Sequence, residues 1–388
     1  MIYPLNRSQI LRLELDTFVC TLPMSAIATI LQGSRKEGST SAEKIQIDRT
    51  TLLEELGKVD QVLLAHLRIG NGRMAVLGRA LQEAPFPNLK ELHFSGNAMA
   101  VESLASLAGA LEMGHLSGLK LLDLSNNKIG DEGCKMLCKH LPLNSVQTLL
   151  LSDSGIGSSG IEALGEALGK CEVSSGLRSL DLSYNHMDLE GAEVIARCLE
   201  SGHLATLEIL NLSNTALGDG GIKAIGSGFA GGKVPALREL NMSSNLEIEG
   251  TEGVMAIGAA FEAKHLNSLA AFYFGGNAIG EKGSLLLAKG FEAHSMPELE
   301  TLSLWATSMG EDGMKELARL LQQGTFPKVT DINLDGNVVT RKSAEAFVHA
   351  FRQNPNLMAK LHMDWPSECF QKRMDLSSRN NITLSLHK

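Results

Sequence analysis

The sequence predicts an α/β solenoid shaped as a horseshoe, with a parallel β-sheet on its concave side and helices on its convex side. A nine-residue pattern of leucines that usually ends in asparagine recurs at starts about 30 residues apart. The apolar residues within it alternate, as they do in a short strand. A glycine turn and an amphipathic helix pattern follow most copies. Solenoids grow by repetition, so the 388 residues need not divide into several compact domains.

The repeated pattern has apolar residues at its first, fourth and sixth positions and usually Asn at its ninth. The clearest copy reads LKLLDLSNN, from Leu119 to Asn127. Alternation directs Leu122 and Leu124 to one side of the strand and Asp123 to the other. Copies begin at Leu89, Leu119, Val146, Leu177, Leu207, Leu237, Leu269, Leu299 and Val329, and a weaker one begins at Val59.

The ninth position predicts a ladder of side chains that runs through the stack. A carboxamide there can satisfy backbone groups at the point where the chain leaves the strand. In three repeats Ser154, Thr215 and Thr307 take the place of the asparagine. The predicted ladder consists of Asn97, Asn127, Asn185, Asn245, Asn277 and Asn337.

A turn and then a helix follow the strand, and the segment Ile129–Gly133 (IGDEG) is the clearest example. Its glycine permits backbone angles that other residues resist, and the Asp beside it suits a helix start. Leu137 and Leu141 then recur four residues apart, which predicts one apolar helix face packed on the strand behind it.

This pattern is the signature of the leucine-rich repeat, and a repeat of about 30 residues with a full helix resembles the ribonuclease-inhibitor-like subclass. Similar turns occur in that inhibitor, in the repeat domains of NOD-like receptors and in Ran GTPase-activating protein. The resemblance covers roughly residues 59–351. It implies the horseshoe fold and says little about function.

Three regions follow from the repeat boundaries. Residues 1–58 are expected to form an N-terminal capping region with one degenerate repeat and a flexible polar loop at about 33–44. Residues 59–351 hold the repeats. Residues 352–388 are expected to form a C-terminal cap, with a last strand within 357–365, and a polar, mildly basic tail.

Composition disfavours several classes of partner. A net charge of -9 opposes binding to nucleic acid or to anionic membranes. No apolar run is long enough for membrane insertion. The six cysteines form no small disulfide framework, and no secretory signal is visible, so we expect reduced thiols in a cytoplasmic protein.

Two motifs that resemble ligand sites are better explained by the repeat. The segment Gly155–Gly160 matches the phosphate-binding pattern GxGxxG, but Gly157 and Gly160 occupy the places of Gly130 and Gly133 in the preceding repeat. Cys134 and Cys138 lie four apart with His140 nearby, yet a second pair of zinc ligands is missing. Buried helix cysteines are the preferred interpretation, and we expect neither cofactor nor metal.

Three histidines, His115, His203 and His265, each precede the first Leu of a repeat by four residues. Their repeats are not neighbours in the stack, which opposes a shared metal site. A role in the loop between helix and strand is the preferred interpretation.

Two functions remain open. The first is a binding module or scaffold, alone or as a subunit of a larger complex, that holds a partner protein on the concave face without catalysis. No nucleophile–base–acid set is present. The second is a GTPase activator resembling Ran GTPase-activating protein. Asn71-Gly72-Arg73 falls in a turn near the place of a family Arg, and Asn126 and Asn127 fall near a family Asn. The long acidic tail of that family is missing, because residues 370–388 carry four bases and one acid.

The predicted binding face consists of the third, fifth and seventh positions of the pattern, opposite the buried leucines. These positions hold six acids and neither Lys nor Arg between Leu89 and Gly336. A basic protein segment would suit them, with Tyr273 and Trp305 as anchors. The alternative is that Asp and Asn simply suit this strand position. The predicted site residues are Glu91, His93, Asp123, Asp181, Asn211, Glu239, Asn241, Tyr273, Ser303, Trp305, Asp331, Asn333 and Asp335.

Overall fold

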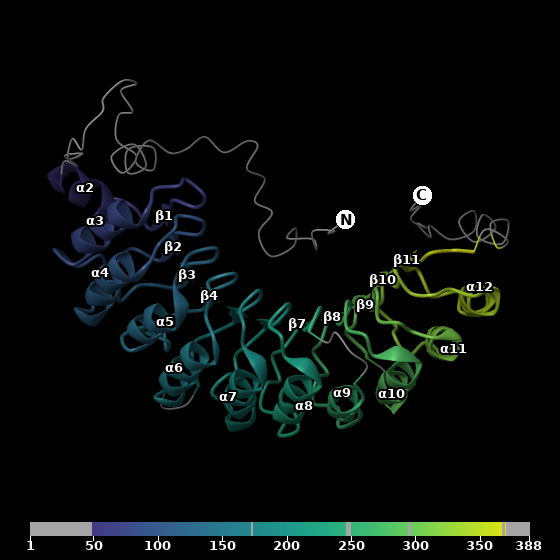
Figure 1. The fold of residues 1–388 in the computed structure, drawn as a ribbon. Coiled ribbons are helices and arrows are strands. Elements are labelled where there is room, and N and C mark those ends of the chain that lie inside the picture. The colour runs from purple at the N-terminus through teal and green to yellow at the C-terminus, as the bar shows by residue number, and fades with distance from the viewer. Residues whose placement is uncertain (1–48, 172–173, 246–249, 294–295, 367–368, 370–388) are drawn as a thin grey trace.

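The computed structural model describes residues 49–171, 174–245, 250–293, 296–366 and 369. Over these residues an 11-stranded sheet runs in chain order from β1 to β11, and its strands pair in parallel. The sheet lines the inside of an open arc and the helices line the outside (Figure 1). The predicted α/β solenoid with a concave parallel sheet is confirmed.

Helices and strands alternate along the chain. The strands are β1 (Gln61–Leu63), β2 (Glu91–His93), β3 (Leu121–Asp123), β4 (Thr148–Leu150), β5 (Ser179–Asp181), β6 (Ile209–Asn211), β7 (Glu239–Asn241), β8 (Ala271–Tyr273), β9 (Thr301–Ser303), β10 (Asp331–Asn333) and β11 (Lys360–His362). The helices are α2 (Arg49–Leu56), α3 (Asn71–Leu81), α4 (Val101–Glu112), α5 (Gly130–Cys138), α6 (Ser158–Gly169), α7 (Asp188–Ser201), α8 (Gly218–Gly228), α9 (Glu252–Glu262), α10 (Gly280–Ala293), α11 (Glu311–Gln323) and α12 (Arg341–Gln353).

The strands pair without any slip, so each position of the pattern forms a straight column across the sheet. Ser179 lies beside Ile209, and Asp181 lies beside Asn211. The fourth and sixth positions point into the core, where Leu122 and Leu124 are fully buried. The third, fifth and seventh positions therefore share the concave face.

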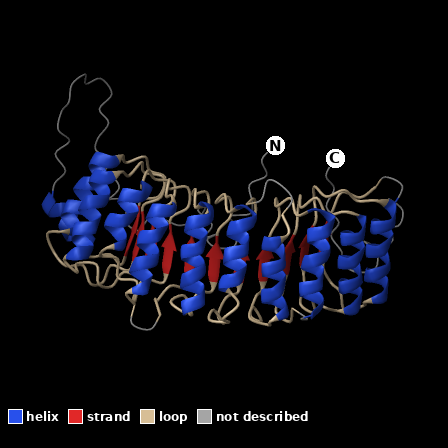
Figure 2. Ribbon diagram, turned by 60° about the horizontal axis from the view of Figure 1, so that its bottom comes forward, coloured by secondary structure: helices blue, strands red, loops and turns tan. Residues whose placement is uncertain are grey.

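The helices form one row along the convex side of the sheet, and in Figure 2 this row stands in front of the strands. Helix α11, for example, buries Met314, Leu317 and Leu321. Near β8 aromatic rings replace the usual leucines, and the ring centres of Phe261 and Phe291 lie 5.1 Å apart. Small aliphatic side chains and these few rings fill the interior of a chain with only 4% aromatic residues.

The asparagine ladder is present as predicted. The side-chain oxygen of Asn127 accepts bonds from the backbone N–H groups of Asn97 and Met99, at 3.1 and 2.9 Å. Its amide group donates to the carbonyls of Phe94 and Leu124, at 3.0 and 2.9 Å. Each ladder residue thus joins its own repeat to the preceding one.

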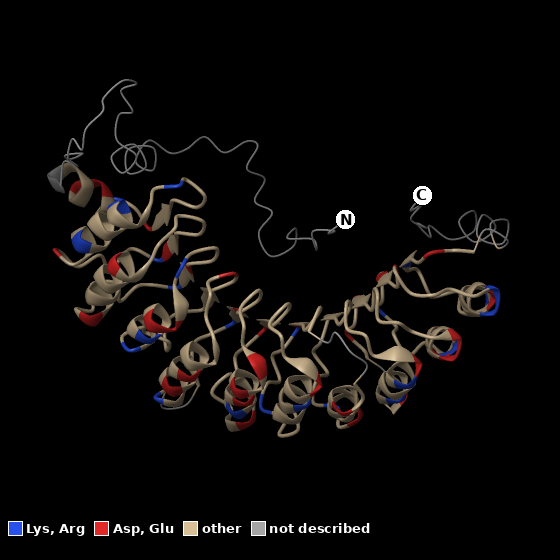
Figure 3. Cartoon of the chain, viewed as in Figure 1, with Lys and Arg blue, Asp and Glu red and all other residues tan. Residues whose placement is uncertain are grey.

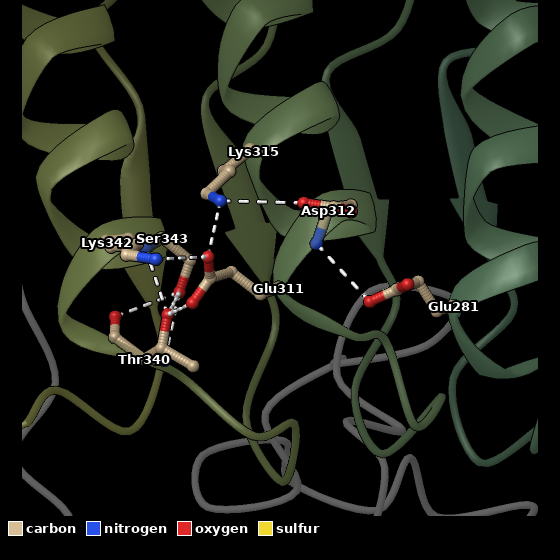
Figure 4. A network of polar contacts seen from close by, with 7 residues as sticks. All are labelled: Glu281, Glu311, Asp312, Lys315, Thr340, Lys342 and Ser343. Carbon is tan, nitrogen blue, oxygen red and sulfur yellow. Dashed lines mark hydrogen bonds and ion pairs between the residues drawn. The ribbon is translucent and has the colours of Figure 1, made fainter.

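Helix starts are capped across the repeat boundary, a feature the sequence pattern did not reveal. In α5, Asp131 Oδ1 accepts bonds from the N–H groups of Gly157 and Gly160, at the start of the next helix. Farther along the chain, Glu311 accepts from the Thr340 hydroxyl at 2.7 Å (Figure 4). Acidic residues at one helix start therefore satisfy the start of the next.

The expected ends fall partly outside the described residues. The degenerate repeat and the loop at about 33–44 lie outside them, as does most of the tail after residue 366. Strand β11 falls within the segment 357–365 that was expected to form the last strand. The three-region division stays a prediction.

Candidate interaction surface on the concave sheet

The thirteen predicted site residues lie at the concave positions of β2, β3 and β5–β10. Eleven of them lie within the three-residue strands, while Trp305 and Asp335 follow β9 and β10 at the seventh position. Between β2 and β10 these columns contain acids but neither Lys nor Arg. Lysines and arginines occur mainly on the helices and the connecting loops (Figure 3).

The fifth position has a structural reason for its Asp and Asn residues. Asp181 Oδ1 accepts bonds from the backbone N–H and the hydroxyl of Ser183, at 2.9 and 2.6 Å. Asn211 does the same for Ser213, at 3.1 and 2.9 Å. Asp123, Asn241 and Asn333 accept from the N–H two residues on. This local turn explains the residue type at the fifth position but not the acids at the third.

In the middle of the face, neighbouring negative charges make the acidic side chains harder to ionise. Burial, and then the negative charge of Asp123, raises the pKa of Asp181, although hydrogen bonds from Ser183 oppose the shift. Burial and the charge of Asp181 raise the pKa of Glu239. Burial, Glu239 and Asp331 together raise the pKa of Tyr273 to about 12. Such a field favours a positively charged neighbour.

Trp305 lies against the neighbouring repeat and does not stand free. A Cβ added at Gly275 would come within 2.2 Å of its Cδ1, and one at Gly276 within 2.7 Å of its Cη2. The indole therefore covers a floor of two glycines after β8. Its Nε1–H is buried and has no hydrogen-bond partner among the residues that the structure describes.

Apolar residues on the same face were not among the predicted site residues. Leu121, Leu150 and Ile209 occupy concave positions of β3, β4 and β6 and are half-buried. Leu63 in β1 is 48% exposed. Their positions in the repeat identify them from the sequence, but the prediction named polar and aromatic side chains. The face is thus apolar in parts of its first half and acidic toward β10.

Basic residues lie around the face. Lys360 takes the third position in β11, beyond the last acid-bearing strand. Arg178 precedes β5 and forms an ion pair with Glu208, which precedes β6. The Arg178 side chain is 56% exposed and that of Glu208 is 36% exposed, so solvent screens the pair and it adds little stability.

The remaining motifs have structural roles. Cys134 and Cys138 are buried with their sulfurs 3.8 Å apart, as expected of core cysteines. The N–H groups of Gly157 and Gly160 already serve Asp131, so this helix start is occupied within the chain. No group of three or more metal-ligating side chains occurs in the described part of the chain.

The loop role of the histidines holds for two of them. Nδ1 of His115 lies 3.1 Å from the Leu81 carbonyl, and Nδ1 of His265 lies 3.1 Å from the Phe229 carbonyl. Each imidazole thus links the loop before a strand to the end of the helix in the preceding repeat. Nδ1 of His203 is buried, and no partner for it lies in the described part of the chain.

Arg73 corrects one expectation. It lies in the first turn of α3, which begins at Asn71, and not in a turn between elements. The Asn71 side chain accepts bonds from the N–H groups of Ala100 and Ser103, so it caps the start of α4. Asn127 belongs to the ladder, which accounts for its side chain without an exposed role.

Comparisons with known proteins agree with the repeat. The family model described as "Leucine Rich repeat" matches residues 116–138, 174–196 and 203–226. The ribonuclease inhibitor of Mus musculus is 27% identical over 179 residues, which are 46% of this chain and 37% of the inhibitor. This chain carries leucine-rich repeats and is similar to ribonuclease inhibitor over part of its length. Proteins of this repeat class generally mediate protein–protein interaction.

Other leucine-rich-repeat relatives are larger than the aligned region. "NACHT, LRR and PYD domains-containing protein 13" of Homo sapiens is 31% identical over 142 residues, 35% of this chain and 13% of that protein. "Ran GTPase-activating protein 2" of Caenorhabditis elegans is 34% identical over 110 residues, 27% of this chain and 12% of that protein. The matches therefore span far less than two thirds of either relative.

Two solved structures are similar at low sequence identity. An internalin from Listeria monocytogenes has a TM-score of 0.45 and 13% identity, with 94% of each chain covered. A TLR13–ssRNA13 complex has a TM-score of 0.41 and 17% identity, with 75% of this chain and 35% of that chain covered. None of the described helices has the length and apolar character needed to cross a membrane.

Proposed function

We propose that the concave face between β2 and β10 of this leucine-rich-repeat protein binds a partner protein that presents basic side chains. One observation carries the proposal: the concave columns of these strands hold six acids and no Lys or Arg. Curved repeat surfaces are the usual binding surfaces of solenoids. The proposal gives the chain a scaffold role in the cytoplasm, alone or as a subunit of a larger complex, with no catalytic step and no cofactor.

The electrostatics of the face support a positively charged partner. Ionised Asp181 and Glu239 are disfavoured by burial and by neighbouring charge, as their raised pKa values show. A Lys or Arg from a partner would relieve both costs and favour the ionised forms. Complementary charge also speeds encounter and excludes wrong partners.

Tyr273 and Trp305 are the proposed anchors. Aromatic side chains at the centre of an interface commonly contribute most of its binding energy. Tyr273 lies in β8 between the acids Glu239 and Asp331, whose charges raise its pKa. Leu121, Leu150 and Ile209 extend the contact with apolar area toward the first strands.

The test begins with an affinity pull-down from native extract and mass spectrometry, followed by measured dissociation constants for the partner found. Affinity should fall as salt rises, because exposed charges are screened within roughly 10 Å at 0.1 M. Asp181→Lys and Trp305→Ala should each weaken binding roughly tenfold or more, about 1.4 kcal/mol.

The matched control is Glu193→Lys, which makes the same charge change on the exposed side of α7, in the repeat that begins with β5. It should leave affinity nearly unchanged. If both concave variants bind as tightly as the parent, or if the partner contacts only the convex helices, the proposal is wrong.

A second candidate function is GTPase activation, favoured by the 34% identity to "Ran GTPase-activating protein 2" over 110 residues. Arg73 is the residue that this candidate would use. The test is GTP hydrolysis by a small GTPase with and without this protein. Arg73→Ala should abolish any stimulation, whereas Arg79→Ala, in the last turn of the same helix, should not.

A further inference from the structure

Acids and large uncharged side chains alternate from strand to strand across the middle of the concave face. The acids in β3, β5 and β7 are Asp123, Asp181 and Glu239. The large uncharged side chains in β4, β6 and β8 are Leu150, Ile209 and Tyr273. All six residues are partly exposed, so a partner can reach each of them from inside the arc.

The unslipped register of the strands fixes the spacing of this alternation. Neighbouring strands lie about 4.8 Å apart, so successive acids are about 9.6 Å apart and a large uncharged side chain lies about halfway between them. The whole pattern from β3 to β8 crosses five gaps between strands, which is about 24 Å. A partner element that lies across the strands meets charge and apolar area in turn.

The other concave positions of these six strands leave room for such an element. The seventh position is small throughout, and from β3 to β8 it holds Ser125, Ser152, Ser183, Ser213, Ser243 and Gly275. The remaining third and fifth positions are uncharged, and they hold Leu121, Thr148, Ser179, Asn211, Asn241 and Ala271. The alternating side chains are thus bordered by small ones, and no other charge competes with the three acids.

An extended partner segment does not match this spacing. A β-strand directs every second residue to one face, about 6.6 Å apart. A polyproline II segment repeats after about 9.3 Å, which matches the acids, but it places no side chain halfway between them on the same face. Each strand from β3 to β8 is also paired on both edges, so an added strand finds no free edge there.

An α-helix that lies across the strands matches both sets of side chains. One helix face presents residues three or four apart and then seven apart, which are about 4.5–6 Å and about 10.5 Å along the axis. The seven-residue step exceeds the spacing of the acids by about 1 Å, which the flexible stem of a lysine can absorb. A helix also satisfies its own backbone groups, so it needs no strand edge.

We propose that the concave face over β3–β8 binds an amphipathic helix of the partner protein, which lies across the strands with basic residues seven apart and apolar residues between them. The basic side chains pair with Asp123, Asp181 and Glu239, and the apolar ones pack on Leu150, Ile209 and Tyr273. Crossing this pattern takes about 16 helical residues. The inference rests on the proposed function, because both assign a basic partner to this face, and it adds the partner's secondary structure and residue pattern.

The experiment uses the full chain and synthetic peptides of about 21 residues, long enough to form a helix. The test peptide has three lysines seven residues apart, leucines midway between them, and alanine and glutamine elsewhere. The control peptide has the same composition with its lysines five residues apart, which places them on different sides of a helix. Fluorescence anisotropy should show the test peptide binding at least about tenfold more tightly than the control. A third peptide, with prolines and a lysine at every third residue, should bind no better than the control.

A charge reversal locates the helix on the face, because the middle lysine lies opposite Asp181 whichever way the helix runs. Asp181→Lys should weaken the test peptide about tenfold, and a peptide with glutamate in place of the middle lysine should regain that affinity for this variant. The same glutamate peptide should not regain affinity for Asp123→Lys. The matched control Glu193→Lys, on the exposed side of α7, should bind the test peptide as the parent does. Circular dichroism checks that each variant is folded, and if Asp181→Lys is not, Asp123→Lys with either end lysine reversed replaces it.

Four outcomes overturn the inference: no peptide binds, the test and control peptides bind equally, the proline peptide binds more tightly than the test peptide, or the charge reversal restores nothing. If a basic partner from extract still depends on Asp181 and Trp305 in that case, the proposed function stands and the helix alone is wrong. If the peptides behave as expected but no natural partner depends on these residues, the helix-binding surface stands and the proposed function is wrong.

Discussion

At the residue scale, the ladder asparagine shows how one side chain can hold two repeats together. Asn127 is 5% exposed and makes five bonds to backbone groups that have little access to water. An amide is suited to this place because it offers both an acceptor and two donors. Serine and threonine can make only some of these bonds, as Ser154 and Thr307 do.

Asn127→Ala should therefore destabilise the protein by roughly 1–3 kcal/mol, because it leaves buried backbone groups without partners. Chemical denaturation followed by circular dichroism measures the change. Asn144→Ala is the control, since the Asn144 side chain is exposed and lies outside the ladder. An unfolding free energy of Asn127→Ala within error of the parent would show that water replaces the lost bonds.

The variant Asp181→Asn tests whether the natural Asp lowers the stability of the folded protein. An acid whose folded pKa lies above its unfolded pKa destabilises the fold when ionised, and the penalty disappears as pH falls through the raised value. Asp181→Asn should keep the bonds to Ser183, as Asn211 keeps those to Ser213. The variant should thus be more stable than the parent at pH 7, and this advantage should decline toward pH 3.8, the ordinary pKa of Asp.

Thermal unfolding of Asp181→Asn and the parent from pH 7 to pH 3 measures this difference. The control is Asp60→Asn, at an exposed residue before β1, which should show no comparable gain. A gain at Asp181 would also mean that the natural residue is retained at a cost in stability, as binding residues often are. A variant less stable than the parent at pH 7 contradicts the prediction.

At the element scale, each helix depends on the helix before it. The carboxylate of Asp131 serves the start of α6, and Asp219 serves the start of α9 through the N–H of Gly253 at 2.8 Å. In Figure 4, Glu281 and Glu311 lie in the same way toward the next helix starts. The negative charge also suits the positive end of the helix dipole.

Asp131→Ala should cost about 0.5–2 kcal/mol, the usual cost of losing an N-terminal cap. The loss should be local to α6, so hydrogen exchange should quicken at its first turn. Glu132→Ala removes an exposed neighbour that pairs only with Lys135, and it should cost much less. If both variants lost the same free energy of unfolding, the negative charge near the helix start would be responsible, and not the capping hydrogen bonds.

At the scale of the whole molecule, each repeat contacts its neighbours in the stack, which makes stability nearly a sum of local terms. Strand β6 pairs with β5 and β7, whereas β11 pairs with β10 alone among the described strands. The end of the sheet should therefore open more easily than its middle.

Amide hydrogen exchange tests this gradient. The amides of Lys360–His362 should exchange faster than those of Ile209–Asn211, because fewer bonds must break to expose them. Equal protection at β11 and β6 would show that the stack opens as one unit.

The sequence by itself determined the architecture, because its pattern repeats often enough for chance to be excluded. The buried side of each strand, the ladder of asparagines and the glycine turns all follow from residue type and spacing. The glycine motif that resembles a phosphate site could also be assigned to the repeat, since Gly157 and Gly160 take the places of Gly130 and Gly133. The acidic columns were also visible once the strands were aligned.

Only the tertiary structure decided which residues of those columns are neighbours. Which residues lie side by side depends on the unslipped register, and that places Asp181 beside Asn211 and allows Glu239 to affect Tyr273. The covering of Gly275 by Trp305 and the use of Asp131 by the next helix are contacts between repeats. Such contacts depend on distances between residues about 30 positions apart, which a pattern within one repeat does not contain.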